Sequence, residues 1–361
     1  MFLYDAPMSA APQRPEDRTV VAPPAQDTAQ AARLTLEHRR ALPLRVGTRA
    51  SPLALWQTRH FLSIVTRFCP VLRDAGAFEE HPIRTTGDRV QDRRLAEIGG
   101  KGLFSKEIHE ALLDRRVDFA VHSLKDLETQ LPAGIVLACT LKREDARDAL
   151  ILPPGGRAPD PADPWGVLPS GSVVGTSSVR RQAQLLAARP DLSVTTIRGN
   201  VQTRLSRVAA GEVSASMLAL AGLRRLGLED SAAAVLDPEA MVPSAGQGIV
   251  GITVREDDEE LRELLSAIED REAAAVSTAE RALLGALDGS CRTPIGGHAR
   301  LLVAPVGVAA SPSLHLTGLV ARPDGSFLLK RSTVGLAADA ARLGAELGDG
   351  LRRDSPSDIF A

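Results

Sequence analysis

Short strand-like stretches alternate with helical stretches through most of the chain, and this alternation constrains the fold more than any other feature. Leu44, Arg45 and Val46 predict a strand, and Ser51 and Pro52 then supply an N-cap and a first-turn proline for a helix. The same order recurs up to about residue 254. It predicts α/β layers with a parallel or mixed sheet. The predicted strands lie at 44–46, near 83, and at 119–121, 135–139, 173–174, 194–197, 216–220 and 249–254, and the predicted helices at 53–67, 105–115, 178–188 and 201–210.

The C-terminal part of the chain follows a different order, with one long helical stretch, then three strands, then a final helix. This order predicts a small α+β domain. Between the two α/β blocks, the segment 153–169 is rich in proline and glycine and predicts a loop. No internal repeat is strong enough to indicate a repeat architecture. The C-terminal elements are predicted at 258–287, 297–302, 314–320, 327–334 and 337–351.

Length and composition exclude several classes of protein. With 361 residues, 44% of them hydrophobic, the chain is long enough for two or three compact domains. Its 43 basic and 45 acidic residues nearly cancel, so no global field favours nucleic acid or a membrane, and a basic site must be local. Cys69, Cys139 and Cys291 are too few and too far apart for a disulfide framework or a tetrahedral metal set. We therefore expect a cytoplasmic protein with no metal, no nucleic-acid partner and no membrane attachment.

Residues 1–42 predict a disordered N-terminal extension, because they are rich in Ala, Pro and Gln and show no apolar periodicity. No continuous apolar run follows a basic cluster, so neither a signal peptide nor a transmembrane helix is predicted. An organellar transit segment is an alternative, because arginines are scattered through the stretch, although its acidic residues argue against it. A true start at Met8 or later is equally consistent with the sequence.

Two loop segments place polar residues next to predicted elements. The segment Gly99 to Phe104 is dense in glycine and directly precedes a helix, so its N–H groups and Lys101 could cradle an anion. A flexible turn that caps the helix explains it equally well. Lys125 and Asp126 follow an apolar strand, where ligands bind in open α/β sheets, and they could tune each other for proton transfer. The alternative is an exposed turn with two solvated charges.

Arginines gather at three predicted strand-to-helix turns of the second block. Guanidinium forks suit carboxylates or phosphates, and in a nearly neutral chain this local excess predicts an anion site. Each arginine alone could simply face water at a helix start. Nucleic acid fits less well, since aromatics are 3% of the chain and none interleaves with these arginines. The set comprises Arg180, Arg181, Arg198, Arg204, Arg224 and Arg225.

Cys291 lies beside Arg292 in a loop rich in glycine and proline. A loop thiol next to an arginine can be accessible and partly ionised, and hence nucleophilic. No histidine partnered by Asn or Asp is identifiable nearby, which gives a papain-like hydrolase little support. Spacing alone also allows a free, inert thiol.

Taken together and in this order, these segments resemble hydroxymethylbilane synthase (porphobilinogen deaminase) over about 300 residues from Leu44 onwards. The resemblance rests on the shared order of the motifs, since each is short. It departs from the family at 127–129, where a proline is usual, and at Val213 and Ser214. The motifs are Arg49 to Ala54, Gly99 to Phe104, His122 to Asp126, Gly175 to Gln182, Arg198 to Val201, Gly246 to Gly248, and the loop that holds Cys291.

The resemblance implies a transferase of haem and porphyrin (tetrapyrrole) biosynthesis. A dipyrromethane is joined to Cys291 through a thioether, and four porphobilinogen molecules are condensed onto it head to tail. Each addition expels ammonia and passes through an azafulvenium cation, and hydrolysis finally frees hydroxymethylbilane. The role implied for Asp126 is to stabilise that cation and to assist the proton transfers.

The resemblance also implies how the carboxylates are bound. Every porphobilinogen carries an acetate and a propionate, which suit guanidinium and ammonium groups. Phe104 is expected to stack on a pyrrole. The implied cofactor-binding residues are Cys291, Lys125, Ser51, Thr176, Ser178, Arg180 and Arg181, and the implied substrate-binding residues are Arg49, Arg198, Arg204, Arg225, Lys101 and Phe104.

The implied architecture is α/β, with two domains like those of periplasmic binding proteins around a cleft and a small C-terminal α+β domain that presents the cysteine. The domains or the growing chain must shift between cycles. The family is typically monomeric, and no apolar heptad argues otherwise. The expected division is 1–42 as the extension, 43–143 with 247–268 as domain 1, 144–246 as domain 2 and 269–361 as domain 3.

Two other functions are compatible with parts of the sequence. A non-catalytic binding protein or sensor of the same two-domain fold would take a small acidic ligand, but it needs neither Cys291 nor Asp126. A cysteine-dependent transferase for other substrates would keep the thiol and leave the arginines unexplained. Fold alone does not decide between these functions.

Overall fold

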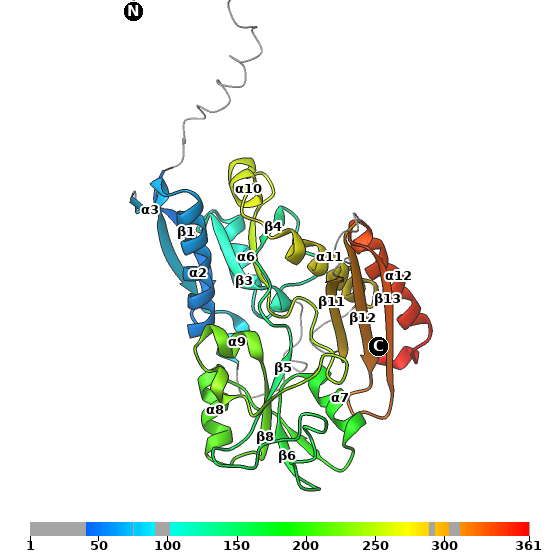
Figure 1. Cartoon of the computed structure of the whole chain (residues 1–361). Helices are drawn as coiled ribbons and strands as arrows, with labels where there is room; N and C mark the ends of the chain where they lie inside the picture. Colours follow the sequence, from blue (N-terminus) through cyan, green and yellow to red (C-terminus); the bar gives the residue numbers. More distant parts are fainter. Residues whose placement is uncertain (1–40, 75, 91–101, 289–292, 303–310, 361) are drawn as a thin grey trace, which may run out of the picture. The chain divides into compact units, whose positions relative to one another are not determined.

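The computed structural model describes residues 41–74, 76–90, 102–288, 293–302 and 311–360. The chain divides into two units, Met1–Ala41 and Leu42–Ala361. The fold below is that of the second unit, whose elements are drawn in Figure 1.

The first α/β sheet has the strand order β2-β1-β3-β10-β4. β1 pairs in parallel with β2 and β3, whereas β10 runs antiparallel between β3 and β4. The sheet is therefore mixed, as the sequence predicts. Its strands are β1 (Leu44–Arg49), β2 (Phe78–Ile83), β3 (Phe119–Ser123), β4 (Ile135–Thr140) and β10 (Val250–Arg255), and its helices are α2 (Pro52–Phe68), α3 (Val71–Asp74), α4 (Thr86–Arg89), α6 (Lys106–Leu113) and α10 (Glu259–Ser266).

The second α/β sheet repeats this topology with the order β7-β6-β8-β5-β9. β6 pairs in parallel with β7 and β8, and β5 runs antiparallel between β8 and β9. The chain crosses between the two sheets after β4 and returns before β10. The strands are β5 (Asp148–Ile151), β6 (Val173–Gly175), β7 (Ser193–Thr195), β8 (Ala215–Ala219) and β9 (Ala234–Val235), and the helices are α7 (Val179–Ala188), α8 (Val201–Ala209) and α9 (Leu220–Arg225).

A separate antiparallel sheet, β11-β12-β13, forms the C-terminal part together with α11 and α12. The core between these elements also takes in Leu124 and Leu127, which flank the turn that carries Asp126. The C-terminal part thus packs directly against that turn. Its elements are α11 (Arg271–Ala286), β11 (Ile295–Leu302), β12 (Ser313–Ala321), β13 (Leu328–Leu336) and α12 (Ala340–Arg353).

Helix starts follow the predicted capping chemistry. The Ser51 hydroxyl accepts a hydrogen bond from the Ala54 N–H, and Pro52 occupies the first turn of α2. The buried face of α2 packs Phe61 edge-on against Phe119 of β3, with ring centroids 5.4 Å apart. This packing fixes the first helix over the first sheet and holds the carboxyl end of β1 beside that of β3.

The observed elements correct the sequence prediction in two ways. The short elements α3, α4, β5 and β9 were not predicted, and neither was α9, which follows β8 without an intervening loop. The single helical stretch predicted at 258–287 is two helices, because Asp270 caps a new helix by accepting a hydrogen bond from the Ala273 N–H.

Candidate functional site

Asp126 and Arg49 meet at the carboxyl ends of two neighbouring parallel strands. Arg49 is the last residue of β1, and Asp126 ends a short 3₁₀ turn directly after β3. Arg49 Nη1 lies 3.9 Å from Asp126 Oδ2, and 32% of the Asp126 side chain is exposed. The structure therefore brings the predicted catalytic carboxylate and a predicted substrate-binding arginine together at the sheet edge where α/β proteins bind ligands.

Arg49 is held by two further side chains. Arg49 forms a two-point pair with the Asp88 carboxylate, in which Arg49 Nε lies 3.2 Å from Asp88 Oδ2. Arg49 Cζ also lies 4.2 Å from the centre of the Phe104 ring, a cation–π contact. Burial alone would raise the pKa of Asp88, but the hydrogen bond and charge of Arg49, together with the hydrogen bonds from Thr85, outweigh it and hold that pKa below its usual value. Sequence analysis missed Asp88, since a single acid in the short helix α4 gives no sign of its distant partner.

Arg180 and Arg181 both point to one buried carboxylate, Asp148. Arg180 Nη2 donates to Asp148 Oδ2 at 2.8 Å, and Arg181 Nη2 donates to Oδ1 at 2.7 Å. Asp148 is fully buried, and both arginines are about 5% exposed. The two predicted cofactor-binding arginines therefore share an internal counter-ion that the sequence did not reveal.

Lys125 lies near this group. Its Nζ is 3.3 Å from the side-chain oxygen of Gln247, which belongs to the segment that returns to the first sheet. Burial lowers the pKa of Lys125 to about 8. The negative charges of Asp126 and Asp148 raise this pKa, whereas the positive charges of Arg181 and Arg180 lower it further. At neutral pH the side chain is thus a cation close to losing its proton.

Arg198 and Arg204 complete the cationic group. Arg198 is 8% exposed, and its Nη2 donates to the Gly87 carbonyl oxygen at 3.1 Å, which joins the two α/β halves. Burial lowers the pKa of Arg204 to about 10, with the charges of Arg181, Arg198 and Arg49 acting in the same direction and Asp126 opposing them. Residues from both halves therefore surround Arg204 with like charge.

The remaining predicted residues take other places. Arg225 Nη2 donates to the Gly248 carbonyl oxygen at 2.6 Å, and its Cζ lies 5.9 Å from the Trp56 ring centre. Ser51 and Ser178 cap α2 and α7, and Thr176 Oγ1 accepts a hydrogen bond from the Ser178 N–H. These hydroxyls order the helix starts that face the arginines. Lys101 and Cys291 lie outside the described residues.

The departure from the family pattern at Glu128 has a local structural role. Its carboxylate oxygens accept the Ser105 hydroxyl at 2.8 Å, and its backbone oxygen accepts Arg281 Nη2 at 2.6 Å. Ser105 directly precedes α6 and follows Phe104. Glu128 thereby ties the turn that carries Asp126 to the start of α6 and to α11.

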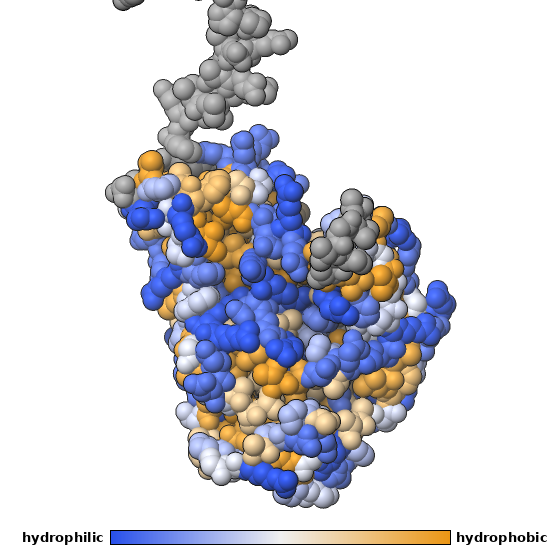
Figure 2. All heavy atoms as spheres, in the orientation of Figure 1, coloured by the Kyte–Doolittle hydropathy of each residue, from blue (hydrophilic) through white to orange (hydrophobic). Residues whose placement is uncertain are grey.

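The described residues fit a ligand with several carboxylates. The buried Nε of Arg181 has no hydrogen-bond partner among the described residues, although nearly every other polar atom of the arginine pair is used. The crowding of like charge around Arg204 would also be relieved by an anion. A carboxylated dipyrrole therefore suits this site. Figure 2 shows hydrophilic residues gathered across the middle of one face, with more apolar surface above and below them.

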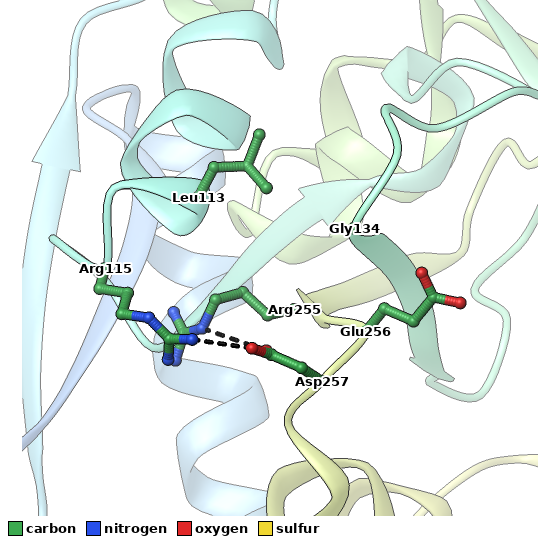
Figure 3. Close-up of a pocket in the computed structure, with 6 residues that line it drawn as sticks. All are labelled: Leu113, Arg115, Gly134, Arg255, Glu256 and Asp257. Carbon is green, nitrogen blue, oxygen red and sulfur yellow. Dashed lines mark hydrogen bonds and ion pairs between the residues drawn. The ribbon is translucent and has the colours of Figure 1, made fainter.

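Two surface hollows lie away from this group. One, of about 350 Å³, is lined by Arg115, Arg255 and Asp257 among others, and Figure 3 shows both arginines reaching towards Asp257. Arg255 is further held by the carbonyl oxygens of Leu112 and Val117, so it offers little to a ligand. The other, of about 570 Å³, lies along α2 at Trp56.

The described residues contain no group of three or more His, Cys, Asp or Glu side chains placed to hold a metal ion. Within the same residues, no helix has the length and apolar character needed to cross a membrane.

Comparisons with known proteins agree on one family. Residues 44–263 match the family model described as "Porphobilinogen deaminase, dipyromethane cofactor binding domain", and residues 274–353 match "Porphobilinogen deaminase, C-terminal domain". A porphobilinogen deaminase of Paracoccus denitrificans is 46% identical over 318 residues, which cover 88% of this chain and 96% of the relative. One of Nitrobacter hamburgensis is 45% identical over 315 residues, which cover 87% and 94%.

Among solved structures, the periplasmic VFT2 domain of Bordetella pertussis BvgS covers 66% of this chain and 92% of its own length, with 15% identity and a TM-score of 0.36. Values this low add nothing about function. The predicted α/β class and the separate small C-terminal domain are confirmed: two mixed sheets with their helices, and a third, antiparallel sheet with α11 and α12.

Proposed function

This chain belongs to the porphobilinogen deaminase (hydroxymethylbilane synthase) family, and from that premise we propose which of its residues carry out the reaction. It is a transferase of tetrapyrrole biosynthesis with a dipyrromethane cofactor. It condenses four porphobilinogen molecules head to tail, releases ammonia at each step, and frees hydroxymethylbilane by hydrolysis. When bound, the cofactor supplies the pyrrole carbon to which the first substrate is joined. We assign its attachment to the thiol of Cys291.

Asp126 is the catalytic residue of the proposal. Its partly exposed carboxylate lies at the strand end, with Arg49 Nη1 at 3.9 Å and most of Arg49 already engaged by Asp88. The Asp126 oxygens are thus left to hold the pyrrole N–H groups, to stabilise positive charge on the substrate and to take up the proton lost from the attacking carbon. The observation that carries this role is the position of one partly exposed carboxylate beside Arg49, within reach of the charges of Lys125 and Arg204.

The cationic side chains of this group are proposed to bind carboxylates. Lys125, Arg180 and Arg181, helped by the helix starts at Ser51, Thr176 and Ser178, would hold the acetate and propionate groups of the cofactor. The same residues orient it and keep water from its charged groups. For the incoming substrate and the growing chain we propose Arg49, Arg198, Arg204, Arg225 and Lys101, with Phe104 packed against a pyrrole.

We further propose the domain division 43–143 with 247–268, 144–246 and 269–361. The three separate sheets, each with strands from one of these parts, support it. We also propose that the protein is a monomer and that it lies in the cytoplasm; the free thiols of Cys69 and Cys139 support the second point. Light scattering after size-exclusion chromatography tests the first point.

The function is tested by product stoichiometry. Purified protein is given porphobilinogen, and ammonia release and the tetrapyrrole formed are measured together. The expected result is four ammonia molecules released for each hydroxymethylbilane. Binding of porphobilinogen without release of ammonia would instead indicate the sensor function.

A further inference from the structure

Asp148 fixes two arginines at once. Beyond their bonds to Asp148, Arg180 Nη1 donates to the Val242 carbonyl oxygen at 2.6 Å and Arg181 Nη1 to that of Met217 at 2.8 Å. A guanidinium held at two of its nitrogens cannot turn. Asp148 therefore sets the direction in which both forks present their remaining N–H groups.

Asp148 also sets the charge of the group. Burial would raise its pKa, but the charges of Arg180 and Arg181 outweigh burial and keep that pKa far below its usual value. The carboxylate is therefore ionised at every working pH. Arg180, Arg181 and Asp148 together carry one net positive charge, so they still attract an anion. The carboxylate compensates the other positive charge, so two unpaired charges are not buried.

Gln247 extends this group to Lys125. Its side-chain nitrogen donates to Asp148 Oδ1 at 2.8 Å and to the Ala146 carbonyl oxygen at 2.7 Å, and its oxygen lies 3.3 Å from Lys125 Nζ. An amide is suited to this place because it donates on one side and accepts on the other. Gln247 is fully buried, and it links the cation beside Asp126 to the counter-ion of the other half.

We propose that Asp148 and Gln247 are positioning residues, which hold Lys125, Arg180 and Arg181 in the arrangement that binds the carboxylates of the dipyrromethane. The inference rests on the function proposed above. Neither residue touches the reacting atoms, so their substitution acts on cofactor retention and on substrate affinity rather than on the chemical step.

The first test is Asp148→Asn, which keeps the shape and removes the charge. The matched control is Asp258→Asn, since Asp258 is also buried and paired with a buried arginine, Arg255, but lies in the α10 cap. We expect the dipyrromethane content, measured by intact mass and Ehrlich reagent, to fall at least about threefold, and KM to rise about tenfold, with kcat per cofactor-loaded enzyme nearly unchanged. The control should keep the parent's values.

The second test is Gln247→Met, which keeps the Asp148 pairs and so folds even if the first variant does not. Its control is Gln184→Met, because Gln184 is a buried glutamine bonded to backbone groups only. Without the amide oxygen the Lys125 ammonium loses an acceptor, so KM should start to rise at a lower pH than in the parent. A merely structural residue would not move this profile.

The outcomes separate the two proposals. A Gln247→Met protein with the parent's cofactor content, KM and pH profile would overturn the inference and leave the function standing. A parent protein that carries no dipyrromethane and releases no ammonia would overturn the function itself. A shifted KM profile in Gln247→Met beside an unchanged Gln184→Met would support the inference.

Discussion

Arg49 Nη1 lies 3.9 Å from Asp126 Oδ2, where two adjacent parallel strands end. The rest of the guanidinium is engaged by Asp88, so the approach to Asp126 is loose and leaves that carboxylate partly open to solvent. An acid tightly paired inside the protein could not serve a succession of substrates. This contrast with Asp148, whose two oxygens are both used by arginines, separates the proposed catalytic carboxylate from the proposed positioning one.

Replacing Asp126 by Asn should abolish most turnover. The amide keeps the shape but cannot take up a proton or stabilise a cation, and general acid–base roles of this kind contribute about 10²- to 10⁴-fold. We expect kcat to fall by at least about 100-fold in a stopped assay of tetrapyrrole formation. Asp324→Asn, on an exposed turn, is the control. A kcat within twofold of the parent would remove Asp126 from the mechanism.

Two arginines on α8 offer a matched comparison. Arg204 faces the cationic group, whereas Arg207 is exposed and pairs with Glu212. Arg204→Gln should raise KM for porphobilinogen about 10- to 100-fold, because a charged hydrogen bond to a substrate carboxylate is lost. Arg207→Gln should leave KM unchanged. Equal KM values for both variants in steady-state assays would show that Arg204 binds no substrate.

The lowered pKa of Lys125 predicts a pH dependence of binding. Its ammonium is present below a pH of about 8 and is lost as the pH rises through that value. Because Lys125 is proposed to hold the dipyrromethane to which porphobilinogen is joined, the KM for porphobilinogen should rise between pH 7 and pH 9, while Lys125→Gln should show a high KM with little dependence on pH. Initial rates measured from pH 7 to pH 9 give KM at each pH. A KM of the parent protein that does not change over this range would show that titration of Lys125 does not affect binding.

A buried histidine predicts a loss of stability in acid. Burial lowers the pKa of His122 to about 3, with His109 and Arg49 acting the same way. The unfolded chain takes up this proton below a pH of about 6.5, so it binds more protons than the folded chain between those values, and stability falls as the pH falls. The single group should cost about 2 kcal/mol between pH 7 and pH 5.

Urea unfolding at these two pH values measures that loss. His122→Gln should show a smaller loss than the parent, though not none, because burial lowers the pKa of His109 and His298 as well. Identical losses in parent and variant would show that another group is responsible.

Much of the fold could be predicted from local patterns. Caps such as Ser51 with Pro52, and the alternation of strands and helices, located most elements of the two α/β halves. β5 was missed because it is four residues long, begins with a charged residue and leads into a proline-rich loop. The division between α10 and α11 was missed because no Gly or Pro marks it.

The two α/β sheets share one topology although the sequence shows no strong repeat. β5 and β10 are each inserted between two strands of their sheets. This placement depends on contacts between segments far apart in the sequence, which local periodicity cannot reveal.

The candidate site divides in the same way. Residues within motifs, such as Asp126, Arg181 and Arg198, could be predicted from the resemblance. Their partners Asp88, Asp148 and Gln247 could not, because an acid or an amide becomes informative only when its distant partner is known.

The central claim is that Cys291 carries the cofactor, and intact mass tests it most directly. The protein is made in cells with ample porphobilinogen and compared with a Cys291→Ser variant. We predict an added mass equal to two linked pyrroles in the parent, with a positive Ehrlich reaction, and neither in the variant. An unmodified parent mass, or the same added mass in both proteins, would contradict the account.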